Sequence, residues 1–242
     1  MAESLHRAEE RLGIIDATAR AGDRRSFLKW AGAAVALFTA TGTLASCGDD
    51  TTEPPAAVSV TLTNDDTGVL NYAYLLEQVE AAFYTQVVAN FYSGVTHVEK
   101  AILTDIRNHE IAHREFFKSL LGPGAIASLT MDFGSIDFTS RGGVLGAAKM
   151  FEDLGVSAYN GVARMISNPD YLLLAGKIVS VEARHAATIR DLLVPRNAAT
   201  GFAGDDIASG DPARGFDGAR SPAQGVEAAG MYIKNSIVNN LI

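Results

Sequence analysis

The chain has 242 residues, of which 48% are hydrophobic and 20% are charged, and this composition is typical of a globular protein rather than a disordered one. Its formal charge of -8 excludes the broad basic surface that nucleic acids require, so no nucleic-acid partner is expected. With a single cysteine, an intrachain disulfide and a multi-thiolate metal site are also excluded.

The first 46 residues have the features of an export signal rather than of a folded domain. Arg24 and Arg25, followed by Ser-Phe-Leu-Lys, resemble a twin-arginine export motif, and residues 30–46 form an apolar stretch rich in small residues. This stretch is too short, and too interrupted by Gly and Thr, to form a transmembrane helix. Cys47 follows it in the sequence Leu-Ala-Ser-Cys, which resembles the cleavage box of a lipoprotein.

The sequence therefore predicts a protein that is exported by the twin-arginine route and tethered to a membrane by a lipid on Cys47, in the periplasm or at the cell surface. No contact with the membrane is expected beyond this anchor. The alternative is an ordinary N-terminal helix in which Cys47 is a free, buried thiol.

Residues 47–68 are rich in Asp, Thr and Pro and lack helical periodicity, so they are expected to form a flexible spacer. Four segments with apolar residues at positions i, i+3, i+4 and i+7 follow, separated by breaks that contain Gly, Pro or Asn. They cover roughly residues 69–92, 96–121, 143–167 and 170–194. The sequence therefore predicts an all-α fold, a four-helix bundle over residues 69–195.

Two connections add detail to this bundle. Thr96 and Glu99 have the spacing of a capping box at the start of the second helix. Residues 122–142 are too many for a tight hairpin and suit a crossover between the two halves of the bundle. The tail of residues 196–242 is expected to be rich in loops, with one short helix over 225–239.

The second predicted helix contains the letters HEIAH, which fit two kinds of metal site. His109 and His113 have the spacing of a zinc protease, in which the Glu between them acts as a base. Glu110 and His113 instead form a Glu-x-x-His pair, which two-metal carboxylate bundles carry on each of two helices. Glu182 and His185 provide a second such pair on the fourth helix, and this favours the two-metal site.

Further carboxylates face the same core. At 100° per residue, Glu77 and Glu80 on the first helix and Glu152 on the third lie among inward apolar residues, whereas Arg184 and Arg190 are expected to point away from the core. A buried carboxylate without a partner costs several kcal/mol, so this crowding predicts bound divalent cations. A polar core satisfied by hydrogen bonds alone is the alternative.

Four carboxylates and two imidazoles suit a pair of iron ions, with manganese as the alternative. The predicted ligands are Glu77, Glu110, His113, Glu152, Glu182 and His185. Glu110 and Glu182 are placed to bridge the two metals, and Glu80 is the alternative to Glu77. His109 is expected to hydrogen-bond a ligand carboxylate rather than bind metal. Tyr84 and Tyr159 are expected either to pack in the core or to donate hydrogen bonds to the site.

The segments "YLLEQVEAAFY", "HEIAHREFFKSLLG", "FEDLGVSAYNGVARMI" and "IVSVEARHAATIRDLL" resemble the bacterial ferritin-like domain family, which is related to plant desiccation-related proteins. The resemblance covers about residues 68–195, and the tail "SPAQGVEAAGMYI" is similar to the family's C-terminal segment. In the wider superfamily the ligand on the first helix is commonly a Glu seven residues before a Tyr. Glu77 and Tyr84 have this spacing, and so do Glu152 and Tyr159, so the resemblance favours Glu77 as the ligand over Glu80.

The resemblance implies a ferritin-like bundle with a two-metal centre that oxidises iron or detoxifies O2 or peroxide. Ferroxidases, rubrerythrins and manganese catalases share these motifs, so the motifs do not select one activity. The alternative function is that of a non-catalytic stress or desiccation protein stabilised by metal. The apolar helix faces leave open whether the chain forms a homodimer.

Overall fold

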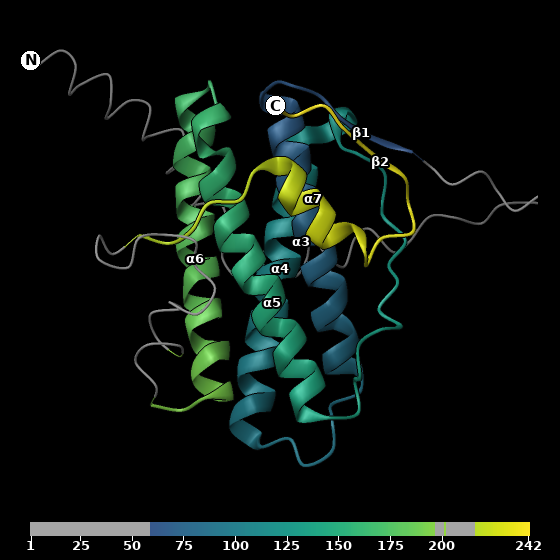
Figure 1. Ribbon diagram of the computed structural model, residues 1–242, viewed down its shortest axis with the longest axis vertical. Coiled ribbons are helices and arrows are strands. Elements are labelled where there is room, and N and C mark those ends of the chain that lie inside the picture. Colours follow the sequence, from purple (N-terminus) through teal and green to yellow (C-terminus); the bar gives the residue numbers. More distant parts are fainter. Residues whose placement is uncertain (1–58, 197–200, 202–215) are drawn as a thin grey trace, which may run out of the picture. The chain divides into compact units, whose positions relative to one another are not determined.

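The computed structural model describes residues 59–196, 201 and 216–242 (Figure 1). The predicted export signal with Cys47, and most of the predicted spacer, lie outside these residues. Within the part of the chain that the structure describes, no helix has both the length and the apolar character needed to cross a membrane.

Four long helices make up the bundle and run side by side in Figure 1. They are α3 (Asp66–Ala89), α4 (His97–Leu121), α5 (Arg141–Val162) and α6 (Pro169–Leu193). Helix α3 packs along α4, α5 packs along α6, and contacts between α3 and α5 join the two pairs. The predicted all-α bundle is confirmed, and the predicted helix ends differ from the observed ones by only a few residues.

The predicted capping box at the start of α4 is present. The backbone N–H of Thr96 donates to Glu99 Oε2 at 2.8 Å, and the backbone N–H of Glu99 donates to Thr96 Oγ1 at 3.1 Å. The second carboxylate oxygen of Glu99 accepts a hydrogen bond from Arg141 Nε at 2.7 Å. Glu99 therefore both begins α4 and ties it to the first turn of α5.

Helix α3 is enclosed on all sides, because residues 68–81 are all buried. Its periodicity predicts a single inward stripe, but the connection between α4 and α5 covers its outer face. Asn71 Oδ1 accepts a hydrogen bond from the backbone of Ile126 at 2.8 Å, and Gln78 Oε1 accepts one from the backbone of Leu129 at 2.9 Å. The connection between α4 and α5, predicted to be a long crossover, therefore packs along the outer face of α3 and buries it.

A short parallel pairing joins the two ends of the described chain. Strand β1 (Val60–Leu62) pairs with β2 (Ile237–Asn239), and both Val60 and Leu62 are buried. The predicted flexible spacer therefore does not extend as far as residue 68. A strand of three residues is too short to show the alternating pattern that indicates a strand. Its partner also lies at the far end of the chain, so the sequence around β1 does not reveal the pairing.

The predicted C-terminal helix is observed as α7 (Pro222–Gly230), which begins and ends earlier than expected. It packs against α3 and α5 (Figure 1). Just before it, the backbone N–H of Arg220 donates to the carbonyl oxygen of Ser157 on α5 at 2.8 Å. The tail thus covers the bundle on the side of α3 and α5.

Gly161 on α5 permits this close packing. A Cβ at Gly161 would lie 1.6 Å from the carbonyl oxygen of Arg220, so a side chain there must displace backbone. We expect Gly161→Ala to lower the free energy of unfolding by about 1–3 kcal/mol through overpacking. Gly146→Ala, on the same helix at a position where a Cβ meets nothing within 4 Å, is the control and should be neutral or stabilising. Chemical denaturation measures both variants, and equal stability would contradict the packing of the tail.

Arg190 on α6 faces the interior, and the prediction that it points away from the core is wrong. Its Nη2 and Nε lie 2.6 and 2.8 Å from Asp153 Oδ1 on α5, and only 4% of Arg190 and 8% of Asp153 are exposed. The carboxylate compensates the buried guanidinium. The pattern of one helix cannot reveal a compensating charge that another helix supplies. Arg184 is exposed, as predicted.

Candidate metal centre

All six predicted ligand side chains meet between the four long helices. One group comprises Glu77, Glu110, His113 and Glu182, and the other comprises Glu110, Glu152, Glu182 and His185. Within each group one donor atom per residue lies within 4.8 Å of the others. Glu110 and Glu182 belong to both groups, so the geometry is that of two adjacent sites that share two carboxylates.

Each imidazole turns its Nδ1 atom toward the carboxylates. His113 Nδ1 lies 3.0 Å from Glu182 Oε1 and 3.3 Å from Glu77 Oε2. His185 Nδ1 lies 2.8 Å from Glu110 Oε1 and 3.4 Å from Glu152 Oε2. The Glu-x-x-His spacing causes this convergence, because residues i and i+3 lie on the same face of a helix.

The donor atoms are buried and lack hydrogen-bond partners. All four carboxylates are 0% exposed. Atoms without a hydrogen bond include both carboxylate oxygens of Glu110 and of Glu182 and the Nδ1 atoms of both histidines, so their short contacts lack hydrogen-bond geometry. Buried polar atoms are almost always satisfied. A set of buried, converging oxygen and nitrogen donors fits a pair of divalent ions of the iron or manganese type.

The pKa values of several carboxylates and of both imidazoles in the two donor groups are strongly shifted. Burial raises the pKa of Glu77 to about 7, and burial together with the neighbouring carboxylates raises the pKa of Glu182 well above its usual range. Burial opposes the charged form of the histidines, but the carboxylates around them outweigh it and raise the pKa of His113 to about 12 and that of His185 to about 10. Without metal, protons must balance the crowded carboxylates, and metal ions would replace those protons.

Two tyrosines hold the outer carboxylates in a crossed arrangement. Tyr84 on α3 donates to Glu152 Oε1 on α5 at 2.5 Å, and Tyr159 on α5 donates to Glu77 Oε1 on α3 at 2.5 Å. Each hydroxyl occupies one oxygen of its partner, so the other oxygen is left to face the histidines. Of the two predicted alternatives for these tyrosines, the structure shows hydrogen-bond donation to the site.

Removing one of these hydroxyls should weaken metal binding. We expect Tyr159→Phe to lower metal affinity by about tenfold or more, because groups that orient ligands typically have effects of this size. Tyr72→Phe is the matched control, since Tyr72 is a buried tyrosine whose hydroxyl has no hydrogen-bond partner. Competition with a coloured chelator measures both affinities. Equal affinities in the two variants would show that the hydroxyl does not orient Glu77.

His109 contacts the site through a histidine, so the prediction that it hydrogen-bonds a ligand carboxylate is wrong. His109 Nδ1 lies 2.9 Å from His185 Nε2, and the two rings are stacked with centroids 5.1 Å apart. His109 is exposed and lies in neither donor group. His109 and His113 therefore do not converge on one point, as a zinc-protease motif would require.

Glu80 lies in neither donor group, whereas Glu77 lies in the first. Glu80 is nevertheless only 3% exposed. Burial, and after it the charge of Glu182, raises its pKa well above the usual range. Glu77 is therefore better placed than Glu80 for a direct bond to a metal in this arrangement, and Glu80 is an additional buried carboxylate beside the centre.

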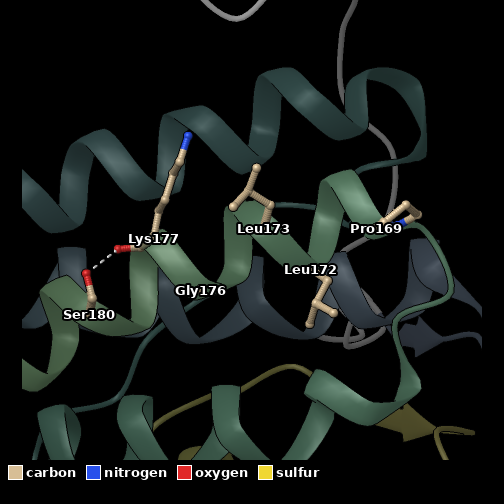
Figure 2. Close-up of a pocket in the computed structure, with 6 residues that line it drawn as sticks. All are labelled: Pro169, Leu172, Leu173, Gly176, Lys177 and Ser180. Atoms are coloured by element: carbon tan, nitrogen blue, oxygen red, sulfur yellow. Dashed lines mark hydrogen bonds between the residues drawn. The ribbon is translucent and has the colours of Figure 1, made fainter. Parts of the chain in front are cut away.

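A hollow on the outer surface of α6 is separate from this centre, and Figure 2 shows its lining. Its residues are Pro169, Leu172, Leu173, Gly176, Lys177 and Ser180. The Ser180 hydroxyl donates to the backbone oxygen of Lys177 at 3.0 Å. None of the lining residues is a carboxylate, imidazole or thiol, so the hollow is not a candidate metal site.

Comparison with known proteins identifies the family. No curated protein matches the chain. The sequence model of the ferritin-like domain matches residues 65–195. This segment contains the four long helices and both donor groups. The chain therefore belongs to the ferritin-like domain family.

Proposed function

We propose that this protein binds two metal ions, iron or alternatively manganese, in a carboxylate-bridged centre, and that it oxidises iron or detoxifies O2 or peroxide outside the cytoplasm. The observation that carries the proposal is the convergence of six buried side chains in two groups that share Glu110 and Glu182. Membership of the ferritin-like domain family supports the same conclusion.

The residues divide into three roles. His113 and Glu77 would hold one metal and His185 and Glu152 the other, and Glu110 and Glu182, which belong to both groups, would be shared between them. The bound metals would supply the electrons for reduction of O2 or peroxide. Tyr84 holds the carboxylate of Glu152 in place by a hydrogen bond, and Tyr159 holds that of Glu77 in the same way. Packing around the site excludes bulk water, which strengthens every electrostatic interaction in it.

Metal content and turnover test the proposal together. The full chain is stripped of metal, supplied with Fe2+ without oxygen, freed of excess metal and examined by elemental mass spectrometry. We expect two iron ions per chain, followed by oxidation of Fe2+ on addition of O2 or peroxide. Bound metal that raises stability without turnover would support the structural stress-protein alternative. A single iron ion per chain, or none, would overturn the two-metal centre.

The proposed location rests on the sequence around Arg24, Arg25 and Cys47. We expect Cys47→Ala to move the exported protein from the membrane fraction to the soluble fraction, because a covalent lipid is the proposed anchor. Immunoblots of fractionated cells measure the distribution, and Thr51→Ser, outside the cleavage box, serves as a control that keeps the thiol. A Cys47→Ala protein that stays with the membrane would contradict the anchor.

A further inference from the structure

Glu80 is a buried carboxylate that the six-residue centre does not use. It is only 3% exposed, and its Oε2 atom has no hydrogen-bond partner among the residues that the structure describes. The hydroxyls of Tyr84 and Tyr159 donate to Glu152 and Glu77 instead. An unpaired carboxylate in such a position costs several kcal/mol unless a cation or a proton compensates it.

Gly155 on α5 provides the space that Glu80 occupies. A Cβ at Gly155 would lie 3.0 Å from Glu80 Oε1 and 3.5 Å from Glu182 Oε2. Both carboxylates therefore reach the same patch of α5 backbone, one from α3 and one from α6. Glycine inside a helix costs about 0.5–1 kcal/mol relative to alanine, so a packing requirement at this position explains its presence.

Glu80 thus lies beside Glu182, which both donor groups share. The carboxylates of Glu80 and Glu182 both lie against the same point of the α5 backbone, at Gly155. The four carboxylates of the two donor groups carry four negative charges, which two divalent ions balance. A fifth carboxylate would compensate one further positive charge at the centre.

We propose that Glu80 is a seventh protein ligand of the centre, binding on the side of Glu182, and that Gly155 is the residue that makes room for it. This inference rests on the proposed two-metal centre. Glu80 would then supply one more carboxylate oxygen donor beside Glu182.

Two variants and one control test this role with Co2+, whose visible absorption reports its coordination number. Glu80→Gln keeps the size of the side chain and removes its charge. Gly155→Ala keeps Glu80 and removes its space. Gly146→Ala, on the same helix with nothing within 4 Å of the added Cβ, controls for the change of glycine to alanine. Circular dichroism of each metal-free variant establishes that the helices are formed.

We expect wild type and Gly146→Ala to bind two Co2+ ions with the same spectrum and affinity. Glu80→Gln and Gly155→Ala should both bind Co2+ at least tenfold more weakly, with absorption that shifts toward a lower coordination number. Glu80→Gln should not lower the thermal stability of the metal-free protein, because the amide keeps the size of the side chain without its charge. A residue with a purely structural role would not weaken metal binding while the metal-free fold keeps its stability.

The outcomes separate this inference from the proposal on which it rests. If wild type binds no Co2+, the two-metal centre itself is wrong and the seventh ligand falls with it. If wild type binds two Co2+ ions and both variants match its spectrum and affinity, the centre stands and Glu80 is not a ligand.

Discussion

Replacing Glu110 and Glu182 together by alanine is expected to abolish two-metal binding while leaving most of the helix content intact. These two carboxylates are common to both donor groups, so their loss reduces each group from four donors to two. One Glu and one His remain in each group, which is too few for a stable site of this metal class. The fold should survive because the substitutions also remove buried charges that the metal-free protein must compensate.

Elemental analysis measures the number of bound metal ions, and circular dichroism measures the helix content. Glu115→Ala is the matched control, because Glu115 lies on α4 with 51% of its side chain exposed and belongs to neither group. We expect the control to keep two metal ions per chain. If the double variant also kept them, the site would have to lie elsewhere in the protein.

The stabilities of the metal-free and metal-loaded proteins are expected to depend on pH in opposite directions. In the metal-free protein the pKa of Glu77 is raised from 4.5 to about 7 by burial, so the folded state holds its proton more strongly than the unfolded state. The stability from this proton is complete below pH 4.5 and is lost as the pH rises through 7. A tenfold difference in proton affinity is about 1.4 kcal/mol, so Glu77 alone accounts for roughly 3 kcal/mol.

His113 and His185 act with the same sign at higher pH. The carboxylates around them raise their pKa values from 6.5 to about 12 and about 10, so the stability that their protons provide is complete below pH 6.5 and is lost as the pH rises toward those values. Glu110, whose pKa is lowered to about 2, matters only in more acidic solution. The metal-free protein should therefore lose stability from pH 5 to pH 8.

Metal binding reverses this trend, because the ligands must release their protons to bind. Each ion present at 1,000 times its dissociation constant adds about 4 kcal/mol of stability, and that constant improves as the pH rises. We expect the difference in Tm between the two forms to widen from pH 5 to pH 8. Thermal scans with and without Fe2+ or Mn2+ measure it. Parallel curves, or a widening that persists in the Glu110/Glu182 double variant, would contradict binding by these carboxylates.

The bundle and its six donor side chains could be predicted because both depend on spacing within single helices. Apolar residues at helical intervals indicate four amphipathic segments, and Glu-x-x-His places two donors on one face. The hydrogen bond from Tyr84 on α3 to Glu152 on α5 is harder to predict, because the sequence shows only that each of these helices carries a Glu and a Tyr two turns apart.

The features that the sequence did not reveal depend on contacts between distant segments. Arg190 could be buried because Asp153 lies opposite it on another helix. His109 contacts a ring of α6 rather than a carboxylate, because it lies at the solvent edge of the inward face of α4. Strand β1 exists because β2 returns to it from the other end of the chain. No periodicity along one segment encodes such partners.

The pairing of β1 with β2 also determines where the domain can be cut. The family match ends at residue 195, but a protein truncated there would lack both α7 and β2. It would leave β1 as an unpaired edge, uncover Tyr72 on α3, against which Gly225 of α7 packs, and remove Ala229 of α7 from the apolar core. Unpaired edges and exposed apolar patches promote aggregation. The smallest unit for expression should therefore extend from before Val60 to beyond Asn239, well past residue 195, where the family match ends.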